Sequence, residues 1–201
     1  MTSPYIIAVG GTLRPNSSTE RAMRQVLENA RRAGARTTLI SGAALQLPLY
    51  QPDNPERSAG ARALVAELAL ADGIILGSPG YHGSISGLIK NALDYAEDLR
   101  GDARPYFSGR AVGCIATAGG WSGAVNTLGA LRDIVHALRG WPTPLGVAIN
   151  TAENVFDEGG ICLLPKVAQS LDIMAGEVMH FAQRMRNSGE PAHTGSLLTG
   201  V

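Results

Sequence analysis

The stretch SPGYHGSISGLIKNALDY, from Ser78 to Tyr95, joins an apolar segment to a helical one through small residues. The preceding residues, DGIILG, predict a short buried strand, and ISGLIKNALDYAEDL predicts a helix that Ser86 caps. A proline stiffens the chain at this junction, and glycines let its backbone approach a flat molecule closely. The junction is therefore a candidate ligand-binding loop at the end of a strand.

Short apolar segments alternate with helical segments on both sides of this junction. Such alternation predicts an α/β fold, with a parallel sheet covered by helices on both faces. Ligands bind such sheets outside the carboxyl ends of the strands, so the loops after the first, third and fourth strands are expected to converge. The predicted strands span residues 5–11, 36–41, 72–79, 110–120 and 144–150, and the predicted helices span 19–35, 59–71, 85–99, 122–140 and 165–186.

Length and composition limit the class of protein. A chain of 201 residues with 45% hydrophobic and 17% charged residues is typical of one globular domain, predicted over residues 1–187, with 188–201 as a mobile tail. Basic and acidic residues number 17 each, so the zero net charge predicts neither a nucleic-acid partner nor a membrane surface. The N-terminal residues MTSPYIIAVGG lack the pattern of a secretory signal and no apolar run is long enough to span a membrane, so we expect a cytoplasmic protein.

The loop GGTLRPNSST follows the first predicted strand and is rich in hydrogen-bond donors. It carries hydroxyls, one amide and one cation, Arg14, and no carboxylate. Backbone N–H groups at the start of a helix attract anions, and hydroxyl donors beside them suit a phosphate. The spacing matches neither a dinucleotide-binding G-x-G-x-x-G loop nor a P-loop, which favours a single phosphate monoester. An ordinary capped turn is the alternative.

Two further glycine-containing loops follow later strands. In SPGYHGSISG, Tyr81 and His82 either stack on a ring or face solvent, and Ile85 at the central position excludes the G-x-S-x-G nucleophile elbow. In TAGGWSGA, the pair Gly119–Gly120 again permits close backbone approach, and Trp121 is either a ligand contact or a packing residue. The four histidines are scattered and predict no metal site, and the two cysteines are expected to be buried small hydrophobes.

These three loops, in this order, resemble those of the NAD(P)H-dependent FMN reductase family of flavodoxin-like proteins. The family pattern G-S-x-R-x-x-S is similar to GTLRPNSS here, and P-E-Y-N-G-S-I-P-G-x-L-K-N-A-L-D is similar to PGYHGSISGLIKNALD. A Gly-Gly loop after the fourth strand matches TAGGWSG, and VFDEGG is a weaker match before the last helix. This chain has Gly80, His82 and Ser86 where the family commonly has Glu, Asn and Pro. The first two differences favour reductases that feed flavin-dependent monooxygenases, and we expect acceptor choice to be determined there.

The resemblance implies a flavodoxin-like three-layer sandwich that binds FMN noncovalently. Its five-stranded parallel sheet has the order 2-1-3-4-5, with helices on both faces. By resemblance, the first loop holds the phosphate, the second borders the isoalloxazine and the third contacts the pyrimidine edge of the ring. The implied cofactor-binding residues are, loop by loop, Thr12, Arg14, Asn16, Ser17 and Ser18; Pro79, Gly80, Tyr81, His82, Gly83 and Ser84; and Gly119, Gly120, Trp121 and Ser122.

The implied activity is hydride transfer from NAD(P)H to FMN, with reduced flavin supplied to a partner flavin-dependent monooxygenase or another acceptor. No dedicated catalytic side chain is expected, because the flavin carries the chemistry. Three alternatives stay open: an FMN-bound reductase of quinones, azo dyes, nitro compounds or metal oxyanions, a flavodoxin-type electron carrier, and a protein that has lost flavin. Carriers dock through acidic surfaces, so the zero net charge disfavours the second.

The family also implies a homodimer or homotetramer with FMN near the subunit interface. The helix 85–99 and the segment GDARPYF are the candidate contacts, and Tyr106 and Phe107 are candidates for reaching a neighbour's flavin.

Overall fold

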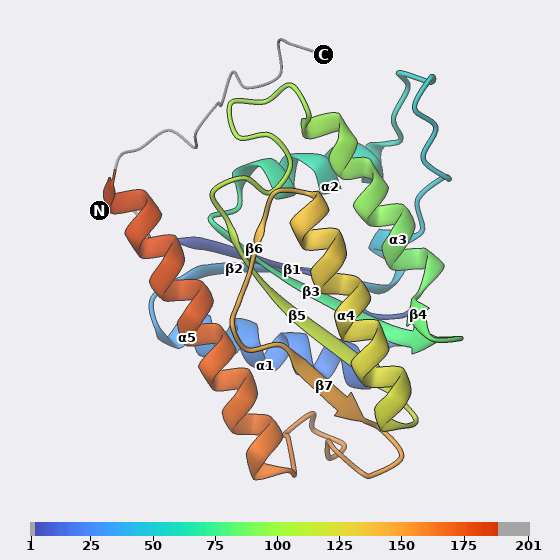
Figure 1. Cartoon of the computed structure of the whole chain (residues 1–201), viewed down its shortest axis with the longest axis vertical. Helices are drawn as coiled ribbons and strands as arrows, with labels where there is room; N and C mark the ends of the chain where they lie inside the picture. Colours follow the sequence, from blue (N-terminus) through green and yellow to red (C-terminus); the bar gives the residue numbers. More distant parts are fainter. Residues whose placement is uncertain (1–2, 189–201) are drawn as a thin grey trace.

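A central parallel sheet organises the computed structural model, which describes residues 3–188 (Figure 1). Its strand order is β2-β1-β3-β5-β6, and β7 also pairs with β5. Since β5 is the fourth predicted strand and β7 the fifth, the predicted order 2-1-3-4-5 is confirmed. The parallel strands are β1 (Tyr5–Gly10), β2 (Arg36–Ile40), β3 (Gly73–Tyr81), β5 (Ala111–Ala118), β6 (Trp141–Pro142) and β7 (Val147–Asn150).

The fifth position of the sheet is divided between two short strands. Trp141 pairs with Ala111 at the start of β5, and Val147 pairs with Ile115 further along the same strand. Pro142 and Pro144 lie in this region and have no backbone N–H to donate to a ladder. This break accounts for the difference between the predicted fifth strand and the two strands observed.

Helices cover both faces of the sheet, which makes the architecture three-layered. One face carries α1 and α5, and the other carries α2, α3 and α4. The predicted helix 85–99 divides into α3 and a 3₁₀ helix, η2, and a short two-residue strand, β4, precedes it. The helical bounds are α1 Ser18–Arg32, α2 Ala59–Leu70, α3 Gly87–Asp94, α4 Trp121–Ala137, α5 Pro165–Ser188, η1 Gly42–Leu45 and η2 Tyr95–Leu99, and β4 is Ser84–Ile85.

Strand β1 shows how the sequence builds the two cores. Ile7 and Val9 join the core under α2, α3 and α4, whereas Ile6 and Ala8 join the core under α1 and α5. All four side chains are at most 1% exposed. Because successive strand residues point to opposite faces, a strand buried on both sides is continuously apolar, as parallel sheets require.

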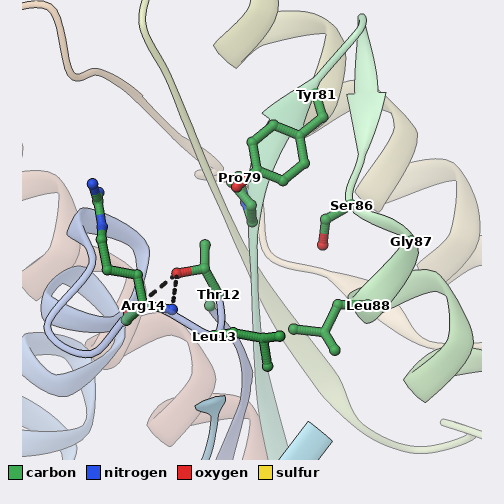
Figure 2. Close-up of a pocket in the computed structure, with 9 residues that line it drawn as sticks. Thr12, Leu13, Arg14, Pro79, Tyr81, Ser86, Gly87 and Leu88 are labelled. Carbon is green, nitrogen blue, oxygen red and sulfur yellow. Dashed lines mark hydrogen bonds between the residues drawn. The ribbon is translucent and has the colours of Figure 1, made fainter. Parts of the chain in front are cut away.

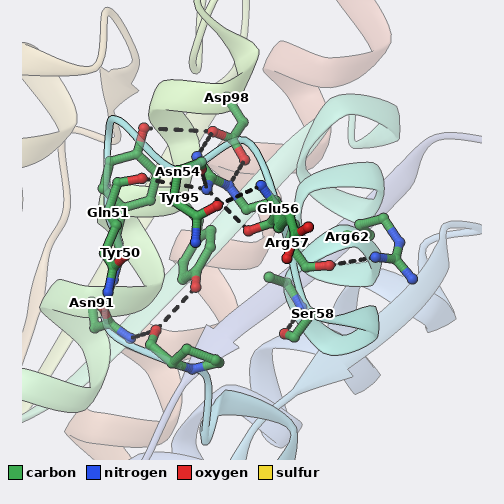
Figure 3. A network of polar contacts seen from close by, with 12 residues as sticks. Tyr50, Gln51, Asn54, Glu56, Arg57, Ser58, Arg62, Asn91, Tyr95 and Asp98 are labelled. Atoms are coloured by element: carbon green, nitrogen blue, oxygen red, sulfur yellow. Dashed lines mark hydrogen bonds and ion pairs between the residues drawn. The ribbon is translucent and has the colours of Figure 1, made fainter.

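The long proline-rich connection before α2 is fixed by a network of polar and aromatic contacts (Figure 3). Arg57 donates to both carboxylate oxygens of Asp98, at 2.7 and 2.8 Å, and lies 4.8 Å from the ring centroid of Tyr50. The hydrogen bonds to Asp98 raise the pKa of Arg57. Asn91 of α3 accepts from the backbone N–H of Tyr50 at 2.9 Å and donates to the carbonyl of Pro48. These contacts hold the connection against α3 and η2.

Two sequence predictions concern the C-terminal tail and the lack of a membrane-spanning segment. The predicted tail starts at 188, and its residues 189–201 lie outside the described part of the structure. Within residues 3–188, no helix is long and apolar enough to cross a membrane.

Candidate functional site

The three predicted loops meet at one edge of the sheet, where β1, β3 and β5 end. Parallel pairing aligns Gly10 with Gly77, and Pro79 with Thr117, so the carboxyl ends of the three strands lie together. A cleft of about 640 Å³ opens at this edge (Figure 2). Its lining residues come from the first loop, the end of β3 and the start of α3: Gly11, Thr12, Leu13, Arg14, Pro79, Tyr81, Ser86, Gly87 and Leu88.

The first loop leaves β1 through two glycines that the backbone requires. A Cβ on Gly10 would lie 2.0 Å from the carbonyl oxygen of Gly77, and Gly11 has a φ of +95°. Beyond them, Thr12 Oγ1 accepts from the N–H of Arg14 at 3.1 Å and donates to its carbonyl at 3.2 Å. This local turn lies at the cleft, and both Thr12 and Arg14 are among its lining residues (Figure 2).

The end of the first loop is a helix start. Ser17 is 2% exposed and caps α1, with its Oγ accepting from the N–H of Glu20 at 3.3 Å. Asn16 precedes it with a φ of 55°, a left-handed conformation that asparagine tolerates better than most residues. Ser17 is therefore the N-cap of α1, and Ser18 is the first residue of the helix.

The second loop is a hairpin. Tyr81 of β3 pairs with Ser84 of β4, and His82 (φ 51°) and Gly83 (φ +86°) form the two-residue turn between them. Two positive φ values in succession are typical of the turn type that best matches the twist of antiparallel strands. His82 is therefore an exposed residue at the hairpin tip, while Tyr81, 54% exposed, borders the cleft.

Two contacts hold the base of this hairpin. Ser78 is fully buried, and its Oγ accepts from the N–H of Ser86 at 3.0 Å while donating to the carbonyl of Pro79 at 2.8 Å. On the other side, a Cβ on Gly80 would lie 2.6 Å from Oγ1 of Thr127 in α4. Thr127 is buried and donates to the carbonyl of Ser84 at 3.3 Å. Gly80 thus lets the hairpin pack against α4.

The third loop presents open backbone. A Cβ on Gly119 or Gly120 would meet no atom of the described chain within 4 Å. Gly120 has a φ of −174°, an extended conformation that any residue adopts. Trp121 begins α4 and is 57% exposed, and Ser122 is also exposed. Neither conformation nor internal packing accounts for Gly120, which is consistent with a backbone left free for close approach of a ligand.

The structure brings only part of the predicted set into the cleft itself. Thr12, Arg14, Pro79 and Tyr81 line it, whereas Asn16 lines a separate groove along α1. The other predicted residues lie in the same three loops but are not among the residues that line the cleft, namely Ser17, Ser18, Gly80, His82, Gly83, Ser84, Gly119, Gly120, Trp121 and Ser122.

Sequence reasoning missed several lining residues and gave Ser86 only a capping role. Gly11 and Leu13 are within the predicted phosphate loop but carry no polar side chain, so a search for phosphate donors passes over them. Gly87 and Leu88 form the first turn of α3, and the hairpin before this turn determines which of its residues face the cleft.

The residues of the cleft fit a flat ring that carries a phosphate. Leu13 and Leu88 point toward each other across the cleft, and the ring of Tyr81 lies above Pro79 (Figure 2). Arg14 supplies a cation, and none of the nine lining residues, all in the described range 3–188, carries a carboxylate. Apolar walls with a few placed donors are typical of cofactor sites, and hydroxyls beside a helix start suit a phosphate. The donor set and the open glycines therefore fit FMN.

A parallel sheet of this order, with helices on both faces and a cleft at its carboxyl edge, defines a flavodoxin-like fold. The model of the NADPH-dependent FMN reductase family matches residues 4–154, and the chain belongs to that family. It is 31% identical over 157 residues to the FMN-dependent NADPH-azoreductase of Staphylococcus aureus (strain USA300), a match that covers 75% of this chain and 79% of the relative. The chain is accordingly an NAD(P)H-dependent oxidoreductase with FMN as its cofactor.

Solved structures of flavoproteins share the fold. RosB with a bound intermediate superposes with a TM-score of 0.76 at 14% identity, covering 94% of this chain and 82% of RosB. The apo form of the NADH:FMN oxidoreductase EmoB gives 0.70 at 20% identity, with 97% of each chain covered. FerB, an NAD(P)H:acceptor oxidoreductase from Paracoccus denitrificans, gives 0.70 at 20% identity, covering 90% of this chain and 98% of FerB. The predicted fold is confirmed by these likenesses.

Proposed function

We propose that this protein holds FMN in the cleft and uses it to reduce flat conjugated acceptors, such as azo compounds and quinones, with NAD(P)H. The observation that carries the proposal is the apolar rim of the cleft. Leu13 and Tyr81 border it and are 51% and 54% exposed. An exposed apolar rim leaves room for a second flat molecule to stack against a bound ring. FMN, when bound, supplies the hydride acceptor for NAD(P)H and the two-electron donor for the second substrate.

The chain's own residues would bind and orient the cofactor. The hydroxyl of Thr12 and the guanidinium of Arg14 would hold the phosphate, with the first turn of α1 supplying N–H groups. Pro79 and Tyr81 would border the ring on the second loop, and the open backbone at 119–120 would approach its pyrimidine edge. The remaining proposed contacts are Asn16, Ser17, Ser18, Gly80, His82, Gly83, Ser84, Trp121 and Ser122.

The choice of acceptor is supported by the relatives. The 31% identical Staphylococcus protein is an FMN-dependent NADPH-azoreductase. A second candidate is supply of reduced FMN to a separate flavin-dependent monooxygenase, which the open side of the cleft favours because a flavin could leave through it.

The test compares acceptors under one set of conditions. FMN-loaded protein is mixed with NADPH or NADH and an azo dye, a quinone or free FMN, and nicotinamide oxidation is followed without oxygen. We expect azo dye and quinone turnover that Tyr81→Ala slows, with Trp141→Ala as the matched control, since Trp141 is 61% exposed at the far end of β5. Rapid reduction of free FMN alone would favour the second candidate. An absence of nicotinamide oxidation with every acceptor would refute both.

We also propose that the protein is a cytoplasmic homodimer or homotetramer, since NAD(P)H is an intracellular reductant. Trp121 and Val125, one turn apart on α4, are 57% and 55% exposed beside the third loop, which supports a subunit contact there. Within the segment GDARPYF, Phe107 is fully buried in the core, so it cannot contact a neighbour's flavin. Light scattering of the wild type and of Trp121→Glu tests this proposal: a monomeric wild type would refute it.

A further inference from the structure

A buried pair of threonine hydroxyls joins the start of α1 to the end of β5, at the edge of the sheet where the cleft opens. Oγ1 of Thr19 and Oγ1 of Thr117 are 2.6 Å apart, although the two residues are 98 positions apart in the chain. Thr19 is 1% exposed and Thr117 is 5% exposed, so the hydrogen bond between them is shielded from water. Each hydroxyl would lose a buried partner if the other were removed.

The two threonines belong to different walls of the site. Thr19 is the second residue of α1 and follows Ser17 and Ser18, the end of the proposed phosphate loop. Thr117 lies near the end of β5, pairs with Pro79 of β3, and precedes the open glycines of the third loop by two residues. The hydrogen bond therefore joins the element that would hold the phosphate to the strand that leads into the ring-edge loop.

Packing around Thr19 makes its position well defined. A Cβ on Gly77 would lie 3.0 Å from Cγ2 of Thr19 and 2.6 Å from Sδ of Met23, so the first turns of α1 rest directly on the backbone of β3. The hydrogen bond between Thr19 and Thr117 adds a direct polar contact between α1 and β5, the strand beside β3 in the sheet.

We propose that Thr19 and Thr117 are positioning residues that set the spacing between the phosphate loop and the ring-edge loop, and thereby favour FMN over flavins without a phosphate. This inference rests on the proposed FMN site. FMN engages both loops at once, so its affinity depends on their spacing. Riboflavin lacks the phosphate and depends on contacts to its ring and ribityl chain. When the spacing of the two loops is fixed before binding, less free energy is spent on ordering them around a ligand that contacts both.

The test measures dissociation constants for FMN and for riboflavin by flavin fluorescence titration of the apoprotein. We expect Thr19→Val and Thr117→Val each to weaken FMN binding about three- to tenfold, the range of one hydrogen bond's net contribution, and to leave riboflavin binding unchanged. The double variant should lose no more than either single variant, because both remove the same bond. Thr19→Ser, which keeps the hydroxyl, should restore the wild-type preference and serves as a second variant if a valine at 19 hinders folding.

The matched control is Thr143→Val. Thr143 is 3% exposed and donates to the carbonyl of Leu145 at 2.8 Å, and its N–H bonds to Val112 at the opposite end of β5. It should lower the stability of the protein without changing the ratio of the two dissociation constants. Equal weakening of both flavins by the Thr19 and Thr117 variants, or no change in either, would overturn the positioning role while leaving the FMN site intact. A wild type that binds FMN no better than riboflavin would overturn the proposed phosphate loop and this inference with it.

Discussion

Replacement of Gly80 by alanine should destabilise the protein, and the cost should depend on Thr127. The added Cβ would lie 2.6 Å from Oγ1 of Thr127, 3.1 Å from the carbonyl of Gly123 and 3.2 Å from Cβ of Ala118. Overpacking of this kind costs about 1–3 kcal/mol, and displacement of Thr127 also weakens its bond to Ser84, worth about 1 kcal/mol. The lower chain entropy of alanine in the unfolded state returns about 0.5–1 kcal/mol. The net expectation is a loss of about 1–3 kcal/mol.

Urea unfolding followed by far-UV circular dichroism measures this loss. Thr127→Ala alone should be destabilising, because it removes the hydroxyl that bonds to Ser84. In that background, Gly80→Ala should cost about 1 kcal/mol less than in the wild type, since the nearest clashing atom is gone. Gly129→Ala is the matched control, because a Cβ there meets no atom within 4 Å of the described chain. An equal cost of Gly80→Ala in both backgrounds, or a stabilised Gly80→Ala variant, would refute this explanation of the glycine.

Three further predictions concern single side chains. A disulfide reagent should modify Cys162 in the native protein but Cys114 only on unfolding, because Cys114 is fully buried and burial raises its pKa to about 12. The Cys114 thiol keeps its proton in the native protein, whereas in the unfolded chain it loses the proton above about pH 8.5. The stabilising contribution of the thiol is therefore complete below that pH and declines as the pH rises toward the folded pKa. The difference in urea midpoint between the wild type and Cys114→Ala should accordingly be smaller at about pH 10 than at neutral pH. Ser17→Ala removes the α1 cap and should cost about 1 kcal/mol in urea unfolding as well as weaken FMN binding, and unchanged values of both would contradict the cap and phosphate roles. Arg110→Met should cost about 2–4 kcal/mol, because the buried guanidinium donates to the carbonyls of Ala69, Ala71 and Tyr106, and a stability equal to the wild type would show that other donors replace it.

The sheet and its layers could be predicted from the sequence because their determinants are local. Each buried strand is a short apolar run and each helix has a periodic apolar face, and parallel pairing then places the strand ends at one edge. The broken fifth strand was not predicted, because the pairing of Trp141 and Val147 with different parts of β5 depends on contacts between distant segments. The prolines in that stretch were the one local indication of a break.

The loops that meet at the cleft were predicted, but only some of the residues that line it were. Arg14 and Tyr81 were found because their chemistry suits a phosphate and a ring, and both line the cleft. Leu88 was missed because its part in the cleft depends on where the hairpin before it directs α3. Residue type indicates what a side chain can bind, whereas the direction in which it points is set by neighbours far away in the sequence.

Two of the three residues that differ from the family pattern, Gly80 and His82, now have local explanations. A side chain at position 80 would collide with Thr127, and His82 occupies a turn position with a positive φ, where the family's asparagine is also well suited. Neither residue lines the cleft, whereas Leu13, Tyr81 and Leu88 do. A residue selects between acceptors through differences in contact energy, so side chains at the rim have a more direct effect than a packed glycine or an exposed turn residue. We therefore propose that the apolar rim, rather than Gly80 or His82, determines acceptor selection, with the hairpin fixing the position of Tyr81 within it.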